Sequence, residues 1–270
     1  MSSYRAVLGT ILATTFALSG QGWAGWVIDE VVKGGEGGRH QVLVQTNRMK
    51  TLLLSEGGKT TTAFILDLDA QTITQVDYER RYYVTSTVQD YVQAMQGAMA
   101  GAMKEMQEAM KGLPPEQRKM MEEMMRSQMG QAQACREPRI EVRKGGQQAT
   151  IAGYPAVRYD VLADGKLQSE LWIAKGITAW RELDPRKLEQ FAVEMAKLSG
   201  CSPSQAQRGR FGADPSWRLA SEGYPVRTMD RSGSGAIVEV VKAESRTVPS
   251  VEFQPPAGFA RKTAREMMGR

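Results

Sequence analysis

Short runs in which apolar and polar residues alternate make up most of the chain, a pattern typical of β-strands. In the first third of the chain these runs are rich in Val, Ile, Leu, Thr and Tyr, and Gly, Asn or Asp separates them. They cover residues 26–32, 40–47, 49–54, 62–68, 72–76 and 81–85. The pattern predicts an antiparallel meander, because turn residues between neighbouring runs reverse the direction of the chain.

The spacing of apolar residues changes to that of a helix at Val88. Residues 88–111 and 115–134 predict two helices, which the short break at residues 112–115 joins into a helical hairpin. Pro115 suits the first turn of the second helix, where no hydrogen bond is lost through its missing N–H.

Alternation returns after the hairpin. It predicts strands at residues 140–143, 149–152, 156–162 and 167–174, a third helix at residues 185–199, and a last hairpin at residues 224–229 and 236–245. We therefore expect an α+β fold with one domain over residues 25–258. In it, a strongly curved antiparallel sheet carries the hairpin at residues 88–134 and the third helix on its concave side. Residues 259–270 are basic and predict a tail without regular structure.

The first 24 residues have the pattern of a cleavable secretory signal. Arg5 is the only charge, residues 6–18 are apolar, and small residues lead to Ala24, where we expect cleavage. An uncleaved anchor is the alternative, but the apolar run is short for a membrane span. The sequence thus predicts export to the bacterial periplasm, with at most peripheral contact with the membrane.

Composition changes this picture little. The 270 residues are 41% hydrophobic and 24% charged, which suits a folded chain, and the net charge is +5. Basic residues are scattered among acidic ones, so a nucleic-acid partner is not expected.

Two cysteines, Cys135 and Cys201, are expected to form one disulfide in an oxidising compartment. The alternative is a pair of buried thiols. No histidine or further cysteine accompanies either position, so no metal site is expected there.

Methionine carries the main functional hypothesis, because ten of the 16 methionines lie in the predicted hairpin. In its first helix the spacing of four, four, three and four residues confines five of them to an arc of about 80°. The candidate ligand-binding residues are Met95, Met99, Met103, Met106, Met110, Met121, Met124 and Met125.

Three interpretations of the methionines remain open. They fill the interface between the two helices, or they line an adaptable groove for acyl chains or apolar protein segments, or they bind Cu(I) through their thioethers. No compact cluster of Met with His or Cys supports the Cu(I) interpretation, and no cofactor is expected.

Several short segments resemble an exported bacterial family, the domain-of-unknown-function family 4412, which is related in fold to the periplasmic lipoprotein carriers and receptors of the Lol system. The resemblance rests on the order of weak motifs from about residue 26 to residue 258. The motifs are residues 47–50 (NRMK), 65–68 (ILDL), 73–77 (ITQVD), 81–83 (RYY), 151–155 (IAGYP) and 170–174 (ELWIA), with echoes at 223–225 (GYP) and 253–258 (FQPPAG).

This resemblance implies an incomplete, strongly bent β-barrel (a Lol-like fold) whose mouth helices cover. It supplies no catalytic residues. We expect a non-enzymatic periplasmic protein that holds hydrophobic ligands, either acyl chains or lipoproteins, between the sheet and the Met-rich helices. The alternative is an envelope protein–protein interaction module that uses the hairpin. An enzyme is the rival class, but the one histidine, His40, lies in no nucleophile motif.

The predicted disulfide generates a first test. Reducing the mature protein should lower its free energy of unfolding by about 4 kcal/mol, because the bridge between Cys135 and Cys201 closes a long loop. Urea titrations with and without reductant measure this change. A Cys135→Ser/Cys201→Ser double variant, which should be insensitive to reductant, is the control. Equal stability of oxidised and reduced protein would contradict the prediction.

Overall fold

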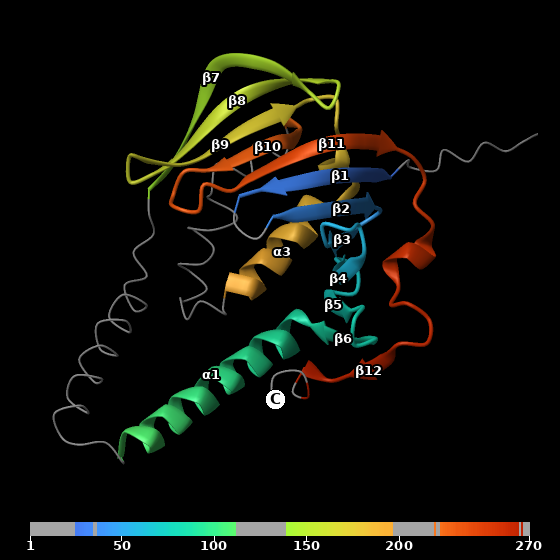
Figure 1. The fold of residues 1–270 in the computed structure, drawn as a ribbon, viewed down its shortest axis with the longest axis vertical. Helices are drawn as coiled ribbons and strands as arrows, with labels where there is room; N and C mark the ends of the chain where they lie inside the picture. The colour runs from blue at the N-terminus through green and yellow to red at the C-terminus, as the bar shows by residue number, and fades with distance from the viewer. Residues whose placement is uncertain are drawn as a thin grey trace, which may run out of the picture.

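The computed structural model describes residues 25–34, 37–111, 139–196, 219, 222–264 and 266. Within these ranges, twelve strands form one sheet in the order β12-β6-β5-β4-β3-β2-β1-β11-β10-β9-β8-β7. The sheet is strongly curved and does not close on itself (Figure 1).

The elements are named in chain order. The strands are β1 (Trp26–Lys33), β2 (Gly38–Gln45), β3 (Arg48–Leu54), β4 (Thr60–Asp67), β5 (Thr72–Asp77), β6 (Tyr82–Thr87), β7 (Ile140–Ile151), β8 (Tyr154–Ala163), β9 (Lys166–Ala174), β10 (Tyr224–Asp230), β11 (Ile237–Ser245) and β12 (Ala260–Lys262). The helices are α1 (Val88–Lys111) and α3 (Pro185–Ala196), with short 3₁₀ turns η1 (Ala179–Glu182) and η3 (Ser250–Phe253).

The predicted meander and the curved, incomplete barrel-like sheet are confirmed, with two differences. The sheet is mixed, because β12 pairs in parallel with β6, whereas the sequence predicted antiparallel strands and a tail without regular structure. The two strands predicted at residues 140–143 and 149–152 are one strand, β7, with an irregularity between Lys144 and Gln148. Of the predicted hairpin, α1 is present, and the residues of the predicted second helix, 115–134, lie outside the described residues.

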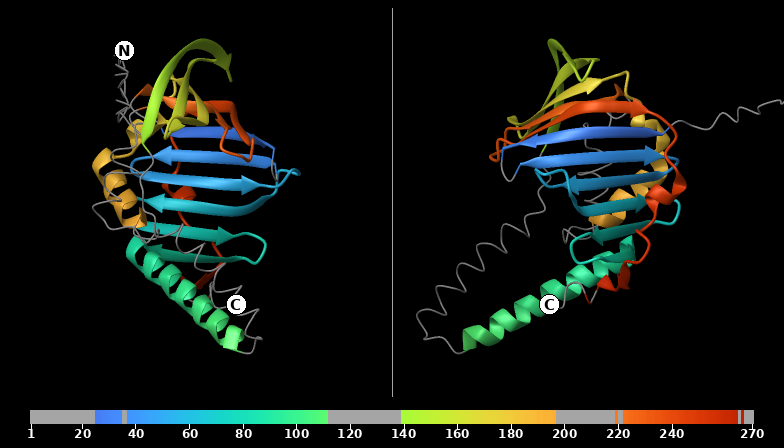
Figure 2. Two further views of the ribbon diagram at one scale, coloured as in Figure 1. Left: turned by 90° about the vertical axis from the view of Figure 1, so that its left-hand side faces the viewer. Right: turned by 45° about the vertical axis from the view of Figure 1, so that its right-hand side comes forward.

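One face of the sheet packs around α3 and η1. Alternation places Trp26 and Ile28 of β1 on this concave face, next to Val42 and Val44 of β2. The apolar side chains that cover them come from the segment after β9 and include Ile177, Ala179, Leu183, Leu188 and Phe191. Helix α3 lies beside one end of the strands (Figure 2), and the concave side is apolar and packed by the chain itself there.

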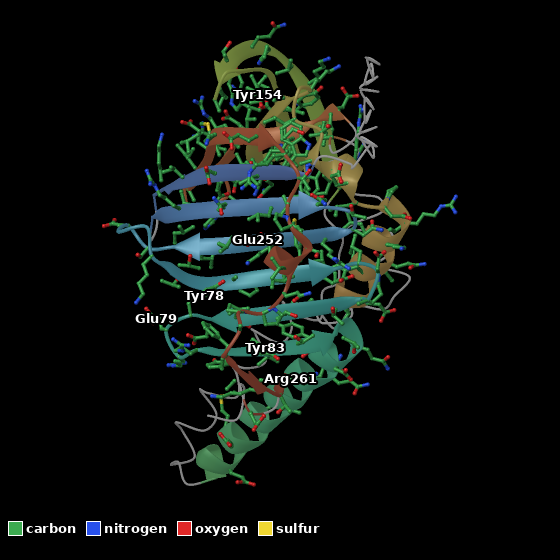
Figure 3. All side chains as sticks on the ribbon, turned by 90° about the vertical axis from the view of Figure 1, so that its right-hand side faces the viewer. Tyr78, Glu79, Tyr83, Tyr154, Glu252 and Arg261 are labelled. Atoms are coloured by element: carbon green, nitrogen blue, oxygen red, sulfur yellow. The ribbon has the colours of Figure 1, made fainter. Side chains whose placement is uncertain are left out.

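The convex face is covered by the segment that follows β11. Val248 and Phe253 of this segment pack on Val27, Leu43 and further residues of the β1–β5 strands. Figure 3 shows Glu252 over the middle of this face and Arg261 at its lower end, near Tyr83. The segment ends as β12 at the edge of β6. Its position is therefore set by contacts with strands distant in sequence, which local sequence patterns do not reveal.

Asn47, in the turn between β2 and β3, joins the sheet to α3. Its Oδ1 accepts a hydrogen bond of 2.7 Å from the backbone N–H of Asp184, and its Nδ2 donates one of 2.9 Å to Asp69. Asp184 in turn caps α3 by accepting from the N–H of Arg186. Asn47 has a left-handed φ of 60°, which Asn tolerates better than most residues.

This connection predicts a graded loss of stability at residue 47. Asn47→Gly should lower the free energy of unfolding by about 1–3 kcal/mol, because two hydrogen bonds are lost. Asn47→Ala should cost about 1 kcal/mol more, because the left-handed backbone strains a residue with a Cβ. Urea denaturation followed by circular dichroism measures both. Equal stability of the two variants would show that backbone strain plays no part.

Candidate functional site

The part of the concave face formed by β3, β4 and β5 includes a row of residues that is not packed against α3. The register places Thr51, Phe64 and Gln75 side by side on β3, β4 and β5, in the same row as the buried Ile28 and Val42. Phe64 keeps 40% of its surface exposed, and its neighbours in this row, Thr51 and Gln75, are polar. Phe64 is therefore a single exposed apolar side chain outside the core that packs around α3.

Helix α1 starts at the edge of this region. Thr87 caps it: its Oγ1 accepts a hydrogen bond of 3.0 Å from the N–H of Asp90 and donates one of 2.7 Å to the carboxylate of Asp90. The start of the helix is held further by a bond from the N–H of Val88 to the carbonyl of Gln71. The helix contacts β6 and α3, and its later turns extend away from the sheet (Figures 1 and 2).

Of the predicted Met face, two side chains are described. Met103 and Met106 are 36% and 40% exposed, and both lie on the part of α1 that extends from the sheet. The side chains of Met95, Met99 and Met110 and all of Met121, Met124 and Met125 lie outside the described residues, as do Cys135 and Cys201. The prediction that these residues form one binding surface stays a prediction.

A polar cleft of about 560 Å³ lies between the start of α1 and α3. Its lining is rich in side-chain amides, three of which are spaced at i, i+4 and i+7 on α1. The lining residues are Gln71, Thr87, Val88, Gln89, Gln93, Gln96 and Glu194. The sequence analysis missed this cleft, because it is assembled from three elements far apart in the chain. The helical spacing of the glutamines was the available signal.

A buried polar cluster lies elsewhere on the concave face. Glu30 of β1 is 9% exposed, and its Oε1 accepts a hydrogen bond of 2.8 Å from the hydroxyl of Tyr224. The Tyr224 ring stacks on Trp180 of η1, with 5.6 Å between ring centroids. His40, beside Glu30 on β2, places its Nδ1 3.9 Å from Glu30 Oε2, which is too long for a hydrogen bond.

Burial controls the protonation of this cluster. It raises the pKa of Glu30 above its ordinary value of 4.5, although the Tyr224 hydroxyl opposes the shift. Burial, together with the neighbouring carboxylate of Glu30, holds the pKa of Tyr224 well above 10. Burial also lowers the pKa of His40. The proximity of His40 and Glu30 therefore does not make a strong ion pair, because desolvation of each group outweighs their attraction.

The raised pKa of Glu30 makes stability depend on pH. Between 4.5 and the folded pKa, the native state binds more protons than the unfolded chain. The free energy of unfolding therefore falls as pH rises through this window, and the loss is absent below it. Glu30→Gln keeps an acceptor for Tyr224 and should remove this fall.

Denaturant titrations at several pH values measure the effect, and Glu105→Gln, an exposed change on α1, is the control. Parallel pH profiles for Glu30→Gln and the unmodified protein would contradict the assignment.

Within the described ranges, no helix is long and apolar enough to cross a membrane. The same residues contain no group of three or more His, Cys, Asp and Glu side chains placed to hold a metal ion.

Solved structures of similar shape have little sequence in common with this chain. An uncharacterized conserved protein from Thermus thermophilus is 10% identical over 89% of this chain and 91% of its own, with a TM-score of 0.44. PNGF-II is 7% identical over 91% of this chain and 32% of its own, with a TM-score of 0.38. A chain of the MucA/MucB complex of Pseudomonas aeruginosa is 12% identical over 87% of this chain and 57% of its own, with a TM-score of 0.36.

No curated protein sequence matches the chain. A family model does match, over residues 79–259, which is more than half of the chain. The matched region runs from the turn before β6 to Phe259, just before β12, and it includes α1, most of the cleft lining and the buried Tyr224. The chain belongs to the family described as a domain of unknown function, DUF4412.

Proposed function

We propose that this protein is a non-enzymatic binding protein of the bacterial envelope that holds the apolar chains of lipids or lipoproteins along α1. The observation that carries the proposal is the exposure of Met103 and Met106 on a helix that extends from the sheet. Thioether side chains are flexible and polarizable, so they adapt to apolar groups of varied shape.

The filled concave face directs the ligand to α1. Ile177, Leu183 and Phe191 pack on the side of the sheet near α3, so the apolar surface there is already in contact with the protein itself. Farther along the same face, the exposed ring of Phe64 supplies a second apolar surface on the side of the sheet from which α1 departs. The proposal therefore places the acyl chain along α1 and not between α3 and the sheet.

The energetics suit a protein that binds apolar chains. Each methylene removed from water contributes about 0.8 kcal/mol, so a few methylenes give measurable affinity without specific polar contacts. The placement in the periplasm rests on the signal-like pattern of residues 1–24.

A second candidate function is docking of an envelope protein. Because α1 extends beyond the sheet, an apolar helix of a partner can pack along Met103 and Met106 without entering the sheet. The two functions differ in what the purified protein carries: a lipid or acyl species in the first, and a copurifying protein in the second.

The proposal predicts that charge on the Met face abolishes lipid binding. Met103→Glu/Met106→Glu should weaken uptake of a fluorescent fatty acid at least about tenfold, because a carboxylate next to an acyl chain is desolvated without a partner. Met103→Leu/Met106→Leu, which keeps the surface apolar, should bind within about threefold of the unmodified protein. Native mass spectrometry of protein purified from the periplasm, followed by organic extraction, tests for a resident ligand.

An apo mass together with no fatty-acid uptake would overturn the lipid-binding proposal. Crosslinking of the same preparation to a defined envelope protein, lost in the Glu variant and kept in the Leu variant, would then support the docking function.

A further inference from the structure

The cleft between α1 and α3 has the chemistry of a site for neutral polar groups. Among the described residues, the side-chain amides of Gln89, Gln93 and Gln96 make no hydrogen bond within the protein. Each amide carries both donors and an acceptor, so it can pair with a hydroxyl or with another amide. The Gln71 amide, in contrast, already makes a hydrogen bond, because its Nε2 donates to the carbonyl of Leu68 at 2.8 Å.

Charge on the lining is sparse. Glu194 of α3 is the single ionisable side chain among the described residues that line the cleft, and no Lys or Arg is among them. An anionic head group such as a carboxylate or phosphate therefore gives up its hydration without meeting a cation on this lining. A neutral head group meets the amides at a smaller desolvation cost.

The face of α1 that lines the cleft also leads toward Met103. Gln96 and Met103 are seven residues apart, which places them about 20° apart around the helix and about 10 Å apart along its axis. The same strip of α1 therefore changes from amide side chains beside α3 to an exposed thioether where the helix leaves the sheet. This separation of about 10 Å, two helical turns, allows one amphiphile to contact Gln96 with its head group and Met103 with its acyl chain.

We propose that the amide-lined cleft is the head-group site of the ligand and that it selects an amphiphile whose head is neutral and rich in hydroxyl or amide groups. The head group hydrogen-bonds Gln89, Gln93 and Gln96, and the acyl chain runs along α1 over Met103. This inference rests on the proposed lipid-binding function and adds the class of ligand. Glycolipid-like heads and acylated peptides share this chemistry.

The test compares amphiphiles with one chain length and different heads. Isothermal titration calorimetry with the full mature protein uses dodecyl maltoside for a hydroxyl head, N-dodecanoylglycine amide for an amide head and dodecyl phosphate for an anionic head, each below its micelle concentration. At least one neutral probe should bind about tenfold more tightly than dodecyl phosphate. The relative affinity of the two neutral probes shows whether the cleft prefers a hydroxyl-rich head, as in a glycolipid, or an amide head, as in an acylated peptide.

Variants connect the selectivity to the cleft. Gln93→Ala/Gln96→Ala should weaken the preferred neutral probe about threefold to tenfold by removing two hydrogen-bonding groups, and should leave dodecyl phosphate unchanged. Gln190→Ala, the same change at an exposed position of α3 outside the cleft, is the matched control and should alter neither. Circular dichroism confirms that each variant is folded.

The outcomes separate the inference from the proposed function. Equal affinity for all heads, unaffected by the Gln variants but lost in Met103→Glu/Met106→Glu, would overturn the head-group inference and leave lipid binding intact. Tighter binding of dodecyl phosphate would overturn it as well. Binding of none of the three probes would overturn both.

Discussion

The structure depends on covering a curved sheet that is apolar on both faces. In β1 and β2, Trp26, Ile28 and Val44 point to one face, while Val27 and Leu43 point to the other. Exposing either face to water would therefore cost free energy. Two segments distant in sequence supply the covers: the region from Ile177 to α3 on the concave side, and the region from Val248 to β12 on the convex side. The free energy of folding therefore depends on long-range contacts, and Asn47 and Asp184 hold the concave cover in register.

The same covering decides which apolar side chains of the concave side stay exposed. Because α3 and η1 cover one part of the concave face, Phe64 on the rest of that face and Met103 and Met106 of α1 stay exposed. The N-terminal turns of α1 are held by Thr87 and by contacts with α3. The amide-lined cleft exists because these two helices meet at an angle beside the β4–β5 turn, with Glu194 and the glutamines of α1 on its walls. Packing of the domain and formation of the candidate site thus have one cause.

Much of the fold was predictable, since period-two alternation and turn residues reflect local backbone preferences. The strands of the meander, the start and end of α1 at Val88 and Lys111, and the position of α3 follow from them. Two features did not follow. β12 has too little local preference to form alone, and its parallel pairing with β6 is supported by Phe259, which packs on Tyr78 and Arg81. The burial of Glu30 was also unpredictable, because a carboxylate in a strand is typical of a solvent-facing position until Tyr224, 194 residues later, covers it.

For the site, the sequence by itself determined the face of α1 on which the methionines lie, because a helix converts spacing directly into direction. It also determined that the glutamines at 89, 93 and 96 share a neighbouring face of that helix. Only the tertiary structure decided which of these side chains remain exposed and what stands opposite them. Whether a side chain is exposed depends on contacts between elements. The contacts of α1 with α3 join residues separated by about a hundred positions in the chain. Local sequence patterns carry no information about contacts over that separation.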